Sequence, residues 1–111
     1  MDYQFELEWQ NTLKKINSLG FEDTTDLDAI LFIIGVQELG KGPKKFSKDE
    51  KNNLLHIAIC CLLEPFGFYK YTHDDEQGWP HYELQKKLPP LKSDEQERLV
   101  KEAIIEYFKF Y

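Results

Sequence analysis

The chain has 111 residues, of which 41% are hydrophobic and 14% aromatic, and this composition excludes an intrinsically disordered protein. Its formal net charge of −6 disfavours a general nucleic-acid binder, because such proteins usually carry a basic surface. The length favours a single domain with its own core, and we expect residues 1–111 to form one helical domain.

The N-terminal segment and the cysteines both favour a reduced cytoplasmic protein. Residues 1–20 carry several charged side chains and no continuous apolar segment, so no secretory signal is expected. The cysteines are adjacent, Cys60 and Cys61, which is not a disulfide framework. No apolar run reaches the ~20 residues that cross a bilayer, so no membrane role is expected.

The first predicted element is a helix over residues 3–19. Gly20 suits the position after a helix, where a left-handed backbone is common. Apolar side chains recur at helical spacing and share one face of this segment: Phe5, Trp9, Leu13, Ile16 and Leu19.

The most apolar stretch of the chain predicts a second helix over residues 26–39. Residues 29–36 contain no charged or amide side chain, so this helix is expected to be central and covered on several sides. Thr25 and Asp28 resemble a capping box at its start. Glu38 lies at the edge of its apolar face and, if partly buried, needs a lysine or a hydroxyl group of the hairpin as partner.

Residues 35–42, GVQELGKG, nearly match the phosphate-binding loop of nucleotide-binding proteins. Gly42 stands where that loop needs a hydroxyl side chain for magnesium, and Pro43 follows where its helix should begin. We therefore interpret the glycines as the stop of the second helix.

A third helix is predicted over residues 48–64, with Ser47 and Glu50 as its capping box. It is apolar except for a narrow stripe that holds His56, Cys60 and Glu64. We expect it to pair with the second helix, with the first and last helices covering that pair.

Residues 68–84 predict a two-stranded antiparallel β-hairpin. Two aromatic segments flank the turn DDEQG of residues 74–78, which we interpret as a solvated turn. Pro80 suits an edge strand, because its missing N–H then needs no partner. Which face of the hairpin points inward stays open at this stage.

Ser93 and Gln96 are predicted to cap a final helix that covers residues 94–109. Its apolar face is predicted to comprise Leu99, Val100, Ala103, Tyr107 and Phe110. The expected fold class is mostly α: a compact four-helix bundle with a two-stranded antiparallel hairpin between the third and fourth helices.

No recognisable catalytic constellation occurs, so we expect no enzyme and no cofactor. His56, Cys60 and Glu64 align on one helix face and could hold a metal ion together with His73, His81 or Cys61. They lack the tight spacing of specific metal motifs, so no metal site is predicted, although the question stays open. Cys60 and Cys61 lie within a helix, away from its N-terminus, and are interpreted as small core residues.

Two surface features are candidates for binding. The loop after the second helix concentrates lysines that could contact phosphate, although a solvated loop is favoured: Lys41, Lys44, Lys45 and Lys48. The hairpin carries more aromatic surface than two short strands bury, which is typical of protein interfaces. The predicted partner-binding residues are Tyr69, Tyr71, Trp79, His81 and Tyr82.

Three segments of the chain resemble a family of small uncharacterised bacterial cytosolic proteins: LDAILFIIGVQELGKG, the stretch from KDEK to LLHIAICCLL, and GWPHYEL. The resemblance covers nearly the whole chain and implies a bacterial source and a compact single domain. It transfers no functional residues.

The sequence thus favours a small non-enzymatic interaction module, an accessory subunit or adaptor that binds another protein or a macromolecular assembly. The alternative is a winged-helix-like nucleic-acid binder or a transcription or translation accessory protein, because two helices followed by a hairpin have the required order. The apolar third helix and the acidic hairpin tip oppose that alternative.

Overall fold

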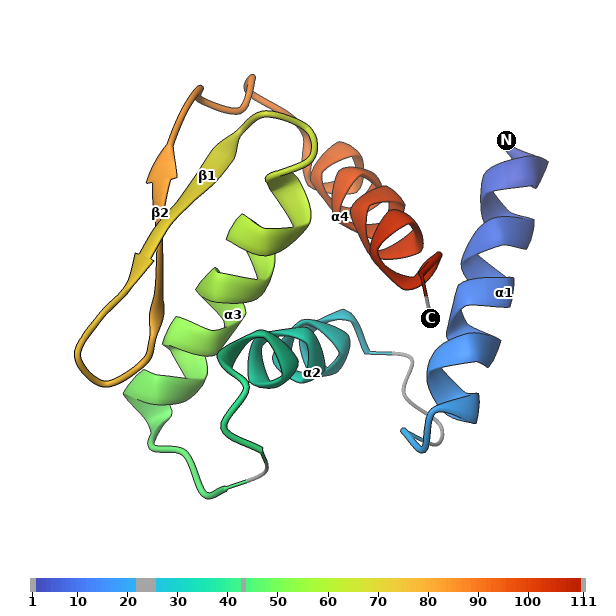
Figure 1. Ribbon diagram of the computed structural model, residues 1–111. Coiled ribbons are helices and arrows are strands. Elements are labelled where there is room, and N and C mark those ends of the chain that lie inside the picture. Colours follow the sequence, from blue (N-terminus) through green and yellow to red (C-terminus); the bar gives the residue numbers. More distant parts are fainter. Residues whose placement is uncertain (1, 22–25, 43, 111) are drawn as a thin grey trace. The chain divides into compact units, whose positions relative to one another are not determined.

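The structure, a computed structural model, describes residues 2–21, 26–42 and 44–110 (Figure 1). The described residues form four helices and one antiparallel hairpin, which confirms the predicted fold class. In chain order the elements are α1 (Tyr3–Ser18), α2 (Leu27–Leu39), α3 (Lys48–Leu63), β1 (Tyr69–Asp74), β2 (Pro80–Leu84) and α4 (Ser93–Phe108). They group into two units, α1 with α4 and α2 with α3 and the hairpin. Folding of the whole chain as one domain stays a prediction.

In the first unit, α1 begins at Asp2, whose carboxylate accepts a hydrogen bond from the Phe5 backbone N–H at 3.1 Å. The buried side chains of α1 are Trp9, Thr12, Leu13 and Ile16. The predicted apolar face was too long at both ends. Leu19 is 45% exposed and Phe5 half-buried, because the helix ends at Ser18 and its first turn lies at the edge of the contact with α4.

The predicted start of the last helix was wrong by one position. Ser93 is the first residue of α4, and the backbone N–H of Lys92 donates to the Glu95 carboxylate at 3.0 Å. Glu95, not Gln96, therefore makes the return bond of the cap, since the third helical residue is the one that reaches back.

The predicted apolar face of α4 also needs correction. Its buried side chains are Ala103, Ile104, Ile105 and Phe108. Phe110 is 91% exposed because the helix ends at Phe108, so helical spacing no longer places it on the packed side. Two long-range bonds join α4 to α1: the Lys15 ammonium donates to the Phe108 carbonyl at 3.0 Å, and Arg98 pairs with Asp2 at 2.6 Å.

In the second unit, α2 begins after Asp26, whose carboxylate accepts from the Asp28 N–H at 3.3 Å. Thr25, the predicted cap, lies outside the described residues. Gly40 ends the helix with a left-handed φ of 73°, so the helix-stop interpretation of the glycines is confirmed. Among the described helices, none has both the length and the apolar content needed to cross a bilayer.

The pairing of α2 with α3 is confirmed and depends on a close backbone approach. Gly35 is buried, and a Cβ placed there would lie 2.3 Å from the Leu54 carbonyl oxygen. Only glycine lets the two helices come this near. The predicted covering of this pair by the first and last helices stays a prediction.

The start of α3 follows the predicted capping box. The Glu50 N–H donates to the Ser47 hydroxyl at 3.2 Å, and the Ser47 N–H donates to the Glu50 carboxylate at 2.9 Å. The predicted polar stripe of this helix is exposed at His56 and Glu64, but the prediction was wrong at Cys60, which is fully buried. The hairpin runs beside α3 (Figure 1).

Candidate functional site

The hairpin has two chemically different faces, and a bulge creates the difference. Residues two apart in a strand normally share a face, but Thr72 is an extra residue, so His73 lies on the face opposite to Tyr71. Cross-strand pairing then sorts the side chains. The tyrosine face carries Tyr69, Tyr71, Tyr82 and Leu84, and the histidine face carries Lys70, His73, His81 and Glu83.

The tyrosine face packs on α3, which settles the orientation that the sequence left open. The Tyr69 ring meets the His56 ring edge-on, with centroids 6.3 Å apart. The Tyr71 and Tyr82 rings form a cross-strand edge-to-face pair with centroids 5.9 Å apart. Such aromatic pairs stabilise a hairpin beyond the apolar area they bury.

A chain of polar contacts joins α2, α3 and β2 under this face. The Cys61 thiol donates to the Glu38 carboxylate at 3.0 Å, and the Tyr82 hydroxyl donates to the Cys61 sulfur. The expected partner of Glu38 was a lysine or a hairpin hydroxyl. The structure gives the Cys61 thiol as a partner of Glu38, and the hairpin hydroxyl binds that thiol. Glu38 itself is exposed, since it lies near the end of α2.

Burial opposes ionisation of both cysteines. Burial raises the pKa of Cys60 to about 11. The pKa of Cys61 also lies well above its ordinary value, first through burial and then through its bond to the Glu38 carboxylate. Burial and the nearby carboxylates likewise raise the pKa of Tyr82. A thiol in such surroundings is a poor nucleophile at neutral pH, because the thiolate is the reactive form.

Trp79 helps to hold the hairpin on the helices. Its ring packs against the buried cluster of Leu39, Phe46 and Leu54, which joins α2, α3 and the loop between them. Its backbone N–H donates to the Asp75 carboxylate at 2.9 Å. Trp79 is thus half-buried by its own chain, and this contact fixes the hairpin tip against the helices.

Asp75 organises the turn that the sequence suggested was merely solvated. One of its carboxylate oxygens accepts from the N–H groups of Gln77 and Trp79, at 3.0 and 2.9 Å, and the other lies 3.0 Å from His81 Nε2. These contacts, with His81 first, lower the pKa of Asp75. The signal was present in the sequence, since aspartate at the start of a turn commonly binds backbone N–H groups two residues on.

The histidine face carries two stacked imidazoles. The rings of His73 and His81 are parallel within 5°, with centroids 4.9 Å apart. The Thr72 hydroxyl lies 3.0 Å from His73 Nδ1 and donates to the His81 carbonyl at 3.1 Å. Both imidazoles are exposed, so this face is polar and the tyrosine face supplies the packing.

Tyr71 is exposed and yet fixed in place. It is 43% exposed, its hydroxyl donates to Asp74 at 3.0 Å, and its N–H donates to the Glu64 carboxylate at 2.7 Å. The bond to Asp74 raises the pKa of Tyr71. The predicted partner-binding residues thus divide into two groups. Tyr69, Trp79 and Tyr82 lie against the helices, whereas Tyr71 and His81 are exposed.

The predicted phosphate-contacting lysines are all exposed. The Lys41 ammonium donates to the Gln77 carbonyl at the hairpin tip, and Lys44 lies over the Phe46 ring with its nitrogen 5.4 Å from the ring centre. Two N–H groups at the start of α3, those of Ser47 and Glu50, already donate within the capping box and are not open to an anion. Phosphate contact by these lysines stays a prediction.

The candidate metal residues are not brought together. His56 Nε2 lies 3.5 Å from the Cys60 sulfur, but the Glu64 carboxylate is engaged with the Tyr71 N–H. Within residues 2–21, 26–42 and 44–110, no group of three histidine, cysteine or acidic side chains is placed to hold a metal ion.

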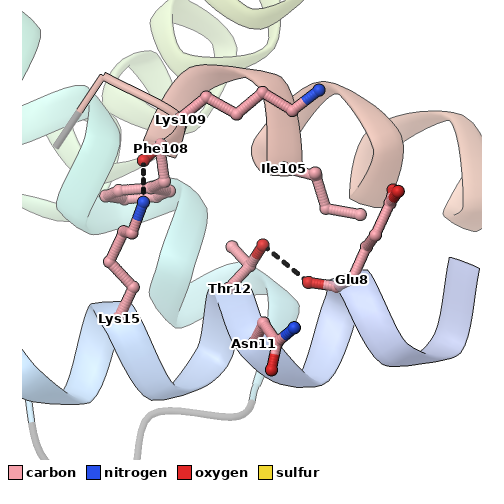
Figure 2. Close-up of a pocket in the computed structure, with 7 residues that line it drawn as sticks. All are labelled: Glu8, Asn11, Thr12, Lys15, Ile105, Phe108 and Lys109. Atoms are coloured by element: carbon pink, nitrogen blue, oxygen red, sulfur yellow. Dashed lines mark hydrogen bonds between the residues drawn. The ribbon is translucent and has the colours of Figure 1, made fainter.

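A shallow pocket of about 190 Å³ lies between α1 and α4 in the first unit (Figure 2). Ile105 and Phe108 line it together with polar side chains of α1. The Thr12 hydroxyl donates to the Glu8 carbonyl at 2.9 Å, and Lys15 binds the Phe108 carbonyl. Sequence reasoning missed this pocket because α1 and α4 are distant in the chain, and its mixed lining indicates no particular ligand.

Comparison with known protein families, curated proteins and solved structures finds no match for this chain. The resemblance to bacterial cytosolic proteins therefore stays a prediction, and the site residues are supported by their own geometry alone.

Proposed function

We propose that the chain is a small non-enzymatic, cytoplasmic interaction module of bacterial origin, an accessory subunit or adaptor that binds a partner protein through its hairpin. The observation that carries this proposal is Tyr71, whose side chain is 43% exposed and donates its hydroxyl to Asp74, while its backbone N–H donates to the Glu64 carboxylate. Tyrosine is enriched among the residues that contribute most to protein interfaces.

The fixed geometry of Tyr71 matters for binding. A side chain that is already ordered loses less conformational entropy on association, so more of its contact energy remains as affinity. Leu84, 49% exposed, lies on the same face of the hairpin and adds apolar area. We expect these residues, together with His81 on the other face, to form the contact surface.

The test is quantitative affinity capture from a lysate of the source organism. A partner should bind the unaltered chain and be lost with Tyr71→Ala, about tenfold or more in affinity for a hot-spot residue. Tyr3→Ala is the matched control, because Tyr3 is 78% exposed and lies in α1, away from the hairpin. A partner retained equally by both variants, or no partner at all, would contradict the proposal.

A nucleic-acid-binding role is the second candidate, supported by the exposed lysines between α2 and α3: Lys41, Lys44, Lys45 and Lys48. The adjacent hairpin tip carries Asp74, Asp75 and Glu76, which would repel phosphate. Duplex binding at low salt that weakens steeply as salt rises, and that falls in a Lys44→Glu variant, would favour this role.

A further inference from the structure

The two long edges of the hairpin are not equivalent, and the backbone shows why. The Gln85 N–H donates to the Phe68 carbonyl at 2.8 Å, so these two residues form a hydrogen-bonded cross-strand pair. The position of this pair determines which of the other cross-strand pairs exchange hydrogen bonds. Because the pattern alternates along an antiparallel ladder, Tyr82 and Leu84 point their backbone N–H and C=O groups away from β1. Tyr71 likewise points its backbone N–H and C=O groups away from β2.

On the β1 side the outward N–H of Tyr71 is satisfied within the chain. The Tyr71 N–H donates to the Glu64 carboxylate at 2.7 Å. On the β2 side, the outward N–H groups of Tyr82 and Leu84 donate no hydrogen bond to any described residue. Pro80 is on this same open edge, where its missing N–H breaks no bond to β1. An open edge of this kind is a template for another strand.

We propose that the β2 edge pairs antiparallel with the β2 edge of a second copy of this chain, with Tyr82 opposite Tyr82. The two hairpins then form one continuous four-stranded sheet. The extension adds strand pairing to a hairpin that its packing on α3 already supports.

The opposing side chains favour a second copy in this register. With Tyr82 at the two-fold axis, His81 of each copy faces Glu83 of the other on the histidine face. The neighbouring register, centred on Glu83, would set two carboxylates directly opposite each other. In the favoured register the Leu84 N–H of one copy donates to the Pro80 carbonyl of the other. The ladder ends there because proline has no N–H with which to return a bond.

Leu84 and His81 belong to both proposed surfaces, but the two proposals can be tested separately. Dimerisation uses the backbone of β2, whereas partner binding depends mainly on the Tyr71 side chain, beside the other edge. A Tyr71→Ala variant should therefore remain dimeric even if it loses a partner protein.

The test is sedimentation velocity of the full chain over a concentration series, with two variants at one position. Leu84→Pro removes an outward N–H without breaking a bond to β1, and it should weaken dimerisation about tenfold or more. Leu84→Ala keeps the N–H and should remain dimeric. Trp79 fluorescence shows whether the hairpin is intact in each variant.

Amide hydrogen exchange of the unaltered chain gives a second measurement that needs no variant. The N–H groups of Tyr82 and Leu84 should exchange slowly in the dimer and faster on dilution. A monomer at every concentration would overturn the inference. So would a dimer in which these amides exchange fast, or one that Leu84→Pro leaves unchanged while its hairpin is intact.

Discussion

At the scale of single residues, burial and two carboxylates favour the neutral form of the Cys61 thiol and outweigh the opposite effect of the Tyr82 hydroxyl. Burial disfavours the thiolate, and the carboxylates of Glu38 and Glu64 repel it. For such an acid a raised pKa means that the folded state holds its proton more tightly than the unfolded state. This contribution to stability is present below the ordinary thiol pKa of about 8.5 and is lost as pH rises through the folded value.

Thiol reactivity tests this environment directly. At pH 8 we expect Cys60 and Cys61 of the folded chain to react with iodoacetamide at least about tenfold more slowly than those of the chain unfolded in guanidinium. The physical reason is that both burial and the raised pKa reduce access to the thiolate. Mass spectrometry of the alkylated peptides gives both rates. Equal rates in the two states would contradict the account.

The pKa of Asp75 is shifted in the opposite direction, because its contacts in the hairpin turn lower it. A lowered pKa contributes stability above the ordinary value near 4, and the contribution is lost as pH falls below it. We expect Asp75→Asn to be less stable than the unaltered chain at pH 7, and the difference should shrink as pH falls from about 5 to about 3. Urea unfolding followed by Trp79 fluorescence measures it. A difference independent of pH would show that the carboxylate charge plays no part.

At the scale of elements, the contact of α2 with α3 depends on the absence of a side chain at Gly35. A Cβ there would lie 2.3 Å from the backbone oxygen of Leu54, which no rotamer change relieves. We expect Gly35→Ala to destabilise the protein by about 2 kcal/mol, since overpacking of about 1–3 kcal/mol outweighs the gain in helix propensity. The free energy of unfolding in urea is the measurement.

Gly40→Ala is the control for this variant. Gly40 has a left-handed φ of 73°, and nothing lies within 4 Å of a Cβ added there. The alanine should therefore destabilise the protein only through local backbone strain, by about 1 kcal/mol. Because Leu54 packs in the same cluster as Trp79, Gly35→Ala should also shift the Trp79 emission, whereas Gly40→Ala should not. The same emission shift in both variants would refute the close-approach explanation.

At the scale of the whole molecule, the two packing units pose a question of cooperativity. The first unit consists of two helices of 16 residues each, too few to hold a core without further support. We therefore expect a single unfolding transition for the chain. The two tryptophans report the units separately, since Trp9 lies in α1 and Trp79 precedes β2.

The measurement uses Trp9→Phe and Trp79→Phe, each of which leaves one fluorescent probe. In each variant the fluorescence midpoint in urea should coincide with the midpoint from circular dichroism, which follows all four helices. Midpoints that separate would mean that the units unfold independently, and the prediction of a single domain would then be wrong.

Local patterns in the sequence determined most of the elements. The capping box of Ser47 and Glu50, the helix stop at Gly40 and the hairpin about residues 74–78 all depend on neighbours in the chain, and all are found where predicted. The errors at Leu19 and Phe110 arose where a helix ended sooner than its apolar spacing suggested.

Only the tertiary structure decided the candidate site. Whether Tyr82 and Trp79 would be buried or exposed depended on the register of the hairpin, and the bulge at Thr72 reversed that register for His73 without leaving a clear trace in composition. The link from Glu38 to Cys61 spans two helices, so no local pattern contains it. Element type follows from short-range hydrogen bonding and spacing, whereas a surface is made by residues far apart in the chain that packing brings together.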